Sequence, residues 1–251
     1  MRARWYGCPR SSETPVGNLV RVGGREADSL QRVQLAAGST LLGSATGTMT
    51  TAALILSAGE SSRFGGYPKA LLSTGERSAI RRLSEICLVD GFDPVVVVVG
   101  AHTLQVSHEL RGLDVSVVVA DRWREGRTAS VQAGLDAIPD DRDILFWPVD
   151  HSFVAARTVD ALLTARDSDL LGVWFIPTFE GRGGHPVVWR SLVRADLLEL
   201  RPDGPIRALL PEFGPQVRRV AVDDPGVVAN VDTPDSYREA LDAFRARGEV
   251  P

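Results

Sequence analysis

The clearest pattern in the chain is a series of short apolar runs separated by amphipathic stretches. The runs are rich in Val, Ile and Leu and lie at residues 52–57, 94–99, 115–119 and 143–148. Continuous apolar runs of this length are typical of parallel strands that are buried on both faces. Helical spacing in the segments between them predicts βαβ units with right-handed connections. We therefore expect an α/β fold in which a Rossmann-like, mostly parallel sheet is covered by helices on both faces.

The second half of the chain is less regular. Residues 170–176 and 184–188 predict two strands joined by the glycine-rich turn at 180–184, as a hairpin over the site. A final helix is expected with Thr233 as its N-cap and Pro234 at its first position. Its apolar face consists of Tyr237, Ala240, Leu241 and Phe244. No internal repeat interrupts this pattern, so we predict a single domain over residues 49–251.

Residues 1–48 differ from the rest of the chain. They contain six arginines and three acidic residues, and they follow neither a helical nor a strand period. We expect a weakly ordered N-terminal extension without the compact apolar region of a signal peptide. Met49 stands just before the first predicted strand, which suggests that translation begins there. An intact mass from the native source that includes residues 1–48 would contradict this hypothesis.

Composition and charge exclude several classes of protein. With 251 residues, 44% hydrophobic and 24% charged, the chain is typical of a globular protein. Its net charge of −4 lacks the basic excess that nucleic acids or anionic membrane surfaces would attract. No apolar run approaches the roughly 20 residues of a spanning helix, so we expect a soluble, cytoplasmic protein. Cys8 and Cys87 show no disulfide or zinc spacing, and we expect Cys87 to be a buried free thiol.

A loop after the first predicted strand carries the strongest candidate chemistry. Of the 28 basic residues 27 are arginine, and the single lysine, Lys69, ends this loop. Glycines allow close backbone approach to a ligand, hydroxyls donate hydrogen bonds, and Arg63 and Lys69 neutralise charge, as a triphosphate requires. The spacing matches neither the Walker loop nor the dinucleotide fingerprint. An ordinary glycine-rich turn between strand and helix is the alternative.

The sequence S-A-G-E-S-S-R-F-G at 57–65, followed by P-K-A-L-L at 68–72, resembles the opening motif of the MobA-like nucleotidyltransferases. The resemblance extends from Ala52 to about Phe244 and implies a nucleotide-diphospho-sugar transferase-like fold. It also implies that this loop wraps nucleotide phosphates, which Arg63 and Lys69 contact. The G-R-T-A-S-V-Q-A-G-L segment at 126–135 is similar to the family segment beside the nucleotide. The implied nucleotide-binding residues are Ser57, Ala58, Gly59, Ser61, Ser62, Arg63, Lys69 and Ser130.

Ser130 and Thr128 are expected at a helix N-terminus, where free N–H groups and the helix dipole favour an anion. Capping of that helix by one of the hydroxyls is an equally natural interpretation.

Two aspartates are candidate metal ligands. Asp150 follows the strand at 143–148, and the corresponding D-x-P motif of the family supplies a Mg²⁺ ligand, although Ser152 stands here in place of the proline. The N-V-D-T-P segment at 230–234 resembles the family motif that carries the second ligand, here Asp232. Two carboxylates from distant strands would then converge on one Mg²⁺; alternatively, Asp232 merely precedes the helix cap. No role in the chemistry is assigned to His151.

The G-H-P segment at 184–186 resembles the molybdenum cofactor cytidylyltransferase (MocA-like) branch, which implies that Gly184 and His185 line the acceptor pocket. The resemblance implies that the substrates are CTP and a phosphorylated acceptor of the molybdopterin type. Handover of the product to a molybdoenzyme or its chaperone is compatible with these substrates. The R-x-G-G-x-x-K spacing that ends at Lys69 instead suits the guanylyl branch with GTP. The segment at 204–210 also resembles a branch feature of the family, a short helix whose Arg207 could reach an acceptor phosphate. Arg207 is equally consistent with a solvated surface residue and is left out of the predicted site.

The reaction implied is attack of an acceptor phosphate oxygen on the α-phosphorus of an NTP, with pyrophosphate leaving. It needs positioning and charge cancellation rather than a covalent protein nucleophile, and Lys69, Arg63 and Asp150 are the expected catalytic residues. A sugar-phosphate nucleotidylyltransferase remains an alternative within the same chemistry. A non-catalytic nucleotide-binding or cofactor-binding protein is the alternative from another class.

Overall fold

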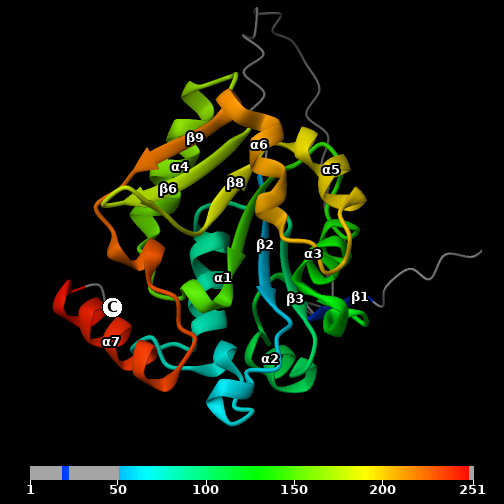
Figure 1. The fold of residues 1–251 in the computed structure, drawn as a ribbon. Helices are drawn as coiled ribbons and strands as arrows, with labels where there is room; N and C mark the ends of the chain where they lie inside the picture. The colour runs from blue at the N-terminus through cyan, green and yellow to red at the C-terminus, as the bar shows by residue number, and fades with distance from the viewer. Residues whose placement is uncertain (1–18, 23–50, 249–251) are drawn as a thin grey trace, which may run out of the picture.

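Among residues 19–22 and 51–248, which the computed structural model describes, nine strands form one mixed sheet (Figure 1). The strand order is β1-β4-β3-β2-β5-β8-β6-β7, with β9 paired to β6. The pairs β2–β3, β2–β5, β3–β4 and β6–β9 are parallel, and the others are antiparallel. The strands are β1 (Leu19–Val22), β2 (Thr51–Ser57), β3 (Val95–Val99), β4 (Val115–Val119), β5 (Asp143–Pro148), β6 (Trp174–Phe179), β7 (Arg182–Gly183), β8 (Val187–Trp189) and β9 (Val217–Ala221). The four strands predicted from apolar runs, β2 to β5, are confirmed to within one residue.

Helices cover both faces of the sheet, as predicted. They are α1 (Ala79–Val89), α2 (Thr103–Glu109), α3 (Arg127–Leu135), α4 (Ala156–Ser168), α5 (Arg194–Glu199), α6 (Leu210–Phe213) and α7 (Pro234–Ala246). Along β2, Ala53 and Ile55 belong to the core shared with α1, α2 and α4, whereas Leu54 and Leu56 belong to the core shared with α3 and α5. This alternation explains why the buried strands are apolar without interruption.

The last helix begins as the sequence indicates. Thr233 is the N-cap of α7, and its hydroxyl accepts a hydrogen bond from the backbone N–H of Ser236 in a reciprocal capping box. Phe244 of α7 packs with Phe153 and Val231 in a third apolar cluster. This cluster holds the loop before α7 against the segment that follows β5. Cys87 is fully buried in α1, as expected, and burial raises the pKa of its thiol.

The predicted hairpin is present, but its bounds are different. Strand β6 begins at Trp174 rather than at residue 170, because the Asp169 carboxylate accepts hydrogen bonds from the N–H groups of Leu171 and Gly172 and forms a turn there. Leu170 and Leu171 are consequently exposed. The short strand β7 follows a tight turn and precedes β8, which pairs antiparallel with β6. Gly184 lies before β8 rather than within it.

One strand was not predicted. Leu19–Val22 forms β1, which pairs antiparallel with β4 at the edge of the sheet. The rest of the N-terminal segment, including Cys8 and Met49, lies outside the described residues, so the extension and the translation start stay predictions. Within the described part of the chain, no helix has both the length and the apolar character that crossing a bilayer requires.

Candidate functional site

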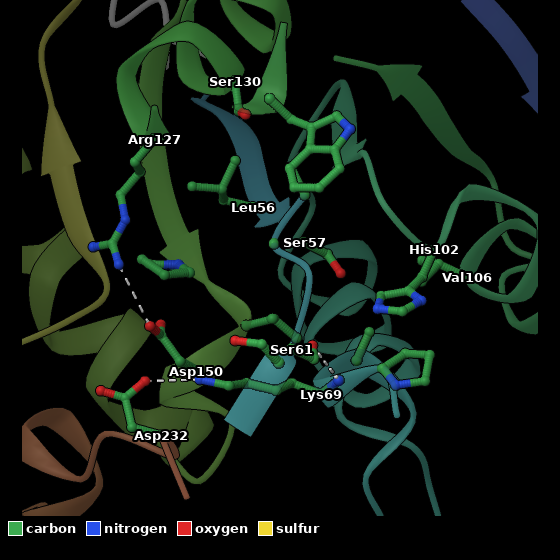
Figure 2. Close-up of a pocket in the computed structure, with 18 of the residues that line it drawn as sticks. Leu56, Ser57, Ser61, Lys69, His102, Val106, Arg127, Ser130, Asp150 and Asp232 are labelled. Carbon is green, nitrogen blue, oxygen red and sulfur yellow. Dashed lines mark hydrogen bonds and ion pairs between the residues drawn. The ribbon is translucent and has the colours of Figure 1, made fainter. Parts of the chain in front are cut away.

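A pocket of about 340 Å³ lies at the carboxyl ends of β2 and β5, where open α/β sheets bind ligands (Figure 2). Its lining includes every residue predicted from the sequence to bind the nucleotide or the metal. These residues are Ser57, Ala58, Gly59, Ser61, Ser62, Arg63, Lys69, Ser130, Asp150 and Asp232. The fold thus brings together four segments that are far apart in the sequence. The roles of these residues in binding stay predictions.

The loop after β2 is folded back on itself so that its two ends meet. Ser61 has a left-handed backbone conformation with φ of 54°, which is uncommon outside glycine. Its hydroxyl accepts a hydrogen bond of 3.1 Å from the backbone N–H of Lys69. Gly65 and Gly66 also have positive φ values and complete the reversal between these residues. This arrangement places the lysine next to the hydroxyls of the loop and makes a compact cradle.

Cations of this loop neutralise Asp232. The Lys69 Nζ atom lies 2.7 Å from Asp232 Oδ1, and Arg63 lies 3.5 Å from Oδ2. The hydrogen bond from Lys69 is the main reason why the pKa of Asp232 is lowered, so this carboxylate is ionised at neutral pH. Asp232 stands in the loop before α7 and not at the end of a strand, which corrects the expectation that both carboxylates come from strands.

Asp150 lies in a short turn directly after β5, as predicted. Its Oδ2 atom is 3.7 Å from the guanidinium of Arg127, whereas its Oδ1 atom is buried without a hydrogen-bond partner. The backbone carbonyl of Asp150 accepts a 2.8 Å hydrogen bond from Val231 N–H, which brings the Asp232 loop alongside (Figure 2). An unpartnered buried carboxylate oxygen, with the ionised Asp232 in the neighbouring loop, suits a hard divalent cation.

The described residues contain no group of three or more side chains that could hold a metal by themselves. Two carboxylates with the remaining positions left to phosphates and water are typical of Mg²⁺ sites. The loop that follows Asp150 is also well held in place although Ser152 replaces the family proline. Arg82 donates hydrogen bonds of 2.9 and 2.8 Å to the carbonyls of Ser152 and Val154.

Gly184 and His185 line a second cavity of about 610 Å³, which adjoins the first at Arg127. A side chain on Gly184 would collide with the carbonyl oxygen of Val227, so only glycine fits there. The backbone N–H of His185 donates to this same carbonyl at 3.0 Å. Burial, followed by the charges of His151 and Arg127, lowers the pKa of His185 to about 3, so its ring is neutral.

Several residues at the two cavities were not predicted. His151 is buried and lines the second cavity, with its ring 4.8 Å from that of His185. Arg207, which was not among the predicted site residues, also lines this cavity. Arg127 borders both cavities, and its place at the first position of α3 was a usable signal, because a cation there opposes the helix dipole. Trp123 borders the first pocket, and no sequence motif indicated this position.

The segment at the start of α3 combines structural and site residues. Ser130 is buried and faces the first pocket. The hydroxyl of Thr128 instead donates a 2.6 Å hydrogen bond to the carbonyl of Gly204, and no side chain caps the helix. Of the two interpretations of this pair, the capping role is therefore wrong.

Several known proteins are similar to this chain in sequence and fold. Among solved structures, a nucleotidyl transferase from Methanothermobacter thermautotroptrophicus has 26% sequence identity and a TM-score of 0.67, over 80% of this chain and all of that one. Rv0371c from Mycobacterium tuberculosis has 26% identity and a TM-score of 0.65, over 77% of this chain and 98% of its own. Rv0371c has also been solved as a complex with manganese.

One curated relative is named as an oxidoreductase rather than as a nucleotidyltransferase. Nicotine blue oxidoreductase of Paenarthrobacter nicotinovorans is 30% identical over 139 residues, which are 54% of this chain and 68% of the relative. The profile of the MobA-like NTP transferase domain matches residues 53–220, which include the phosphate loop and Asp150. This match spans well over half of the chain, and the chain therefore belongs to the MobA-like NTP transferase family.

Proposed function

We propose that this member of the nucleotidyltransferase family transfers NMP from an NTP to a phosphorylated acceptor in a reaction that depends on a divalent metal. CTP with Mg²⁺ and an acceptor of the molybdopterin type are the proposed substrates. One observation carries the proposal: a single pocket contains a phosphate-type loop with Arg63 and Lys69 and, opposite it, the unpartnered buried oxygen of Asp150. The manganese bound by Rv0371c is consistent with a divalent ion in such a site.

The charges of the pocket suit this substrate. Asp150 and Asp232 would hold the metal, which when bound supplies positive charge beside the reacting phosphate. Lys69 and Arg63 pair with Asp232, and Arg127 pairs with Asp150. If Asp150 and Asp232 held a metal in place of these cations, the cations would be available to phosphate oxygens of the nucleotide. The pocket therefore binds a charged substrate without leaving a buried charge uncompensated.

The acceptor would occupy the second cavity beside Gly184 and His185, with its phosphate directed at the nucleotide pocket. Its phosphate oxygen forms the new bond to the α-phosphorus, and the bond from the α-phosphorus to the bridging oxygen breaks as pyrophosphate leaves with the electron pair. The G-H-P segment and Ala58 favour CTP, and the spacing of the phosphate loop favours GTP. Handover of the product to a molybdoenzyme or its chaperone belongs to the same proposal.

The function is tested by measuring pyrophosphate release with each of the four NTPs and Mg²⁺ or Mn²⁺, with and without molybdopterin. We expect release only when the acceptor is present, and fastest with CTP. Thermal stabilisation by NTPs without release in any mixture would favour a non-catalytic nucleotide-binding protein. Because one relative is named an oxidoreductase, NADH and NADPH are included. Stabilisation by these nucleotides, but not by NTPs, would contradict the proposal.

Replacement of Asp150 by Asn tests the metal site. The amide cannot supply the negative charge that the cation requires, so metal-dependent turnover should fall roughly 10²- to 10³-fold. Circular dichroism and the melting temperature should stay close to those of the wild type. Asp235→Asn, which removes an exposed carboxylate from the first turn of α7, is the matched control and should retain full turnover. Full activity of Asp150→Asn would show that the assigned metal site is wrong.

A further inference from the structure

The second cavity carries a positive charge that the protein does not compensate. Arginines at four positions line it, and Asp203 is its one acidic residue. Asp203 already accepts hydrogen bonds of 3.2 and 3.3 Å from Arg201, which does not line the cavity. In contrast, the side chains of Arg182, Arg207 and Arg219 form no ion pair or hydrogen bond with other described residues. Unpaired cations around one concavity create a field that attracts anions.

The wall of the same cavity is aromatic. The rings of Phe146 and Trp189 are stacked with centroids 4.8 Å apart, and Trp174 lies 5.3 Å from Trp189. His185 meets the edge of this group at 5.6 Å from Phe146. The three rings of Phe146, Trp174 and Trp189 are at most 3% exposed, so they pack against one another and form a closed apolar floor of the cavity.

Buried polar atoms without partners are concentrated at this wall. The indole nitrogens of Trp174 and Trp189 and the Nδ1 atoms of His151 and His185 are buried and make no hydrogen bond. Such atoms are uncommon in native proteins and call for a specific explanation. Because all four atoms are closed to solvent, a ligand reaches them only if the side chains of this wall move.

Arg127 differs in position from the other three arginines that line the second cavity. It borders both cavities, whereas the other three border the second cavity alone. Its guanidinium lies 3.7 Å from Asp150, and its side chain is 59% exposed and therefore free to change partners. An anion held by Arg127 would lie between the nucleotide and the second cavity, next to the assigned metal ligand.

We propose that the second cavity binds an acceptor with two anionic groups joined by an apolar body. Arg127, which borders both cavities, holds the group that attacks the nucleotide. The arginines that border the second cavity alone, Arg182, Arg207 and Arg219, supply positive charge for the other group. The assignment of the attacking group rests on the proposed function, whereas the class of ligand rests on the cavity itself. A volume of about 610 Å³ is sufficient for a ligand of this size.

The proposal is tested with two fluorescent probes, naphthalene-2,6-disulfonate and naphthalene-2-sulfonate, which differ by one anionic group. We expect the full-length protein to bind the disulfonate about tenfold more tightly, because a hydrogen-bonded ion pair contributes about one order of magnitude in affinity. The double variant Arg182→Gln/Arg219→Gln should lose this preference, and so should Arg127→Gln. Arg245→Gln removes an exposed arginine from α7, outside both cavities, and should keep the preference.

Three results would overturn the inference. Equal affinities for the two probes in the wild type would exclude a second anion site. An unchanged preference in the cavity variants, or its loss in Arg245→Gln, would show that the charge acts at another place. Loss of disulfonate binding in Lys69→Gln would locate the probe in the nucleotide pocket. The absence of pyrophosphate release would defeat the proposed function but leave the binding result intact, so the two failures are distinguishable.

Discussion

At the scale of single residues, the one lysine of the chain, Lys69, lies in the candidate site. Its side chain is only 17% exposed, contacts Asp232 through Nζ, and lies 5.8 Å from the centre of the Phe64 ring. A compact ammonium fits this narrow space as a point charge, whereas a guanidinium needs room for a planar fork. Lys69→Arg should therefore lower kcat/KM for the NTP about tenfold or more, although the charge is kept. Steady-state kinetics with wild-type values would show that the position requires only a positive charge.

The lowered pKa of His185 predicts how the stability of the protein depends on pH. This pKa is about 3 in the folded protein against an ordinary value of 6.5, because burial disfavours the charged ring. Between these two pH values the unfolded chain binds a proton that the folded protein does not bind, so stability falls as the pH decreases below 6.5. His185→Gln should remove about 2 kcal/mol of the loss between pH 7 and pH 5. Urea denaturation at both pH values measures this difference, and an equal loss in the two proteins would contradict it.

At the scale of elements, the loop at 224–232 connects the parts of the site. Its Val227 carbonyl holds His185, its Val231 N–H holds the Asp150 carbonyl, and it ends at Asp232. Asp224 anchors the loop: this fully buried carboxylate accepts hydrogen bonds from Ala155 N–H and the Thr158 hydroxyl on one oxygen, and from Gly226 N–H on the other.

Replacement of Asp224 by Ala should therefore destabilise the protein and the site together. Three buried donors would lose their acceptor, and we expect the free energy of unfolding to fall by about 3 kcal/mol or more. Thr158→Val removes only one of these hydrogen bonds and should cost about 1 kcal/mol. Urea denaturation compares the two variants, and equal costs would show that the carboxylate does not anchor the loop as its contacts indicate.

The elements also show which parts could be predicted from the sequence. The strands β2 to β5 were predictable because they are buried on both faces of the sheet. Burial of this kind requires a run of apolar residues, which is visible in the sequence. The place of the loop at 57–69 and of Asp150 in one pocket was predictable because both follow these strands in the chain. The positions of Arg127 and His151 at the second cavity depend on the packing of β6, β8 and the loop at 224–232, which no local pattern encodes.

At the scale of the whole molecule, strand β5 connects a structural centre with the site. Asp143 begins the strand, and Asp150 follows its end. The buried carboxylate of Asp143 accepts hydrogen bonds from Arg166 of α4 at 3.1 Å, Arg190 after β8 at 3.4 Å and the N–H of Ser191 at 3.0 Å. This network joins the parallel half of the sheet to the antiparallel half, at the end opposite to the nucleotide pocket.

The two ends of β5 should respond differently to the same change. Asp143→Asn removes the buried carboxylate that the two largely buried guanidinium groups of Arg166 and Arg190 share, and Arg166 then keeps only the exposed carboxylate of Asp167. The free energy of unfolding should fall by about 3 to 5 kcal/mol. The remaining folded protein should still bind CTP with the wild-type Kd, since Asp143 lines neither cavity. Asp150→Asn should show the reverse, with stability kept and turnover lost. Urea denaturation and CTP titration of both variants measure stability and nucleotide affinity separately. A large rise in the Kd for CTP in folded Asp143→Asn would mean that the Asp143 network shapes the pocket as well as supporting the sheet.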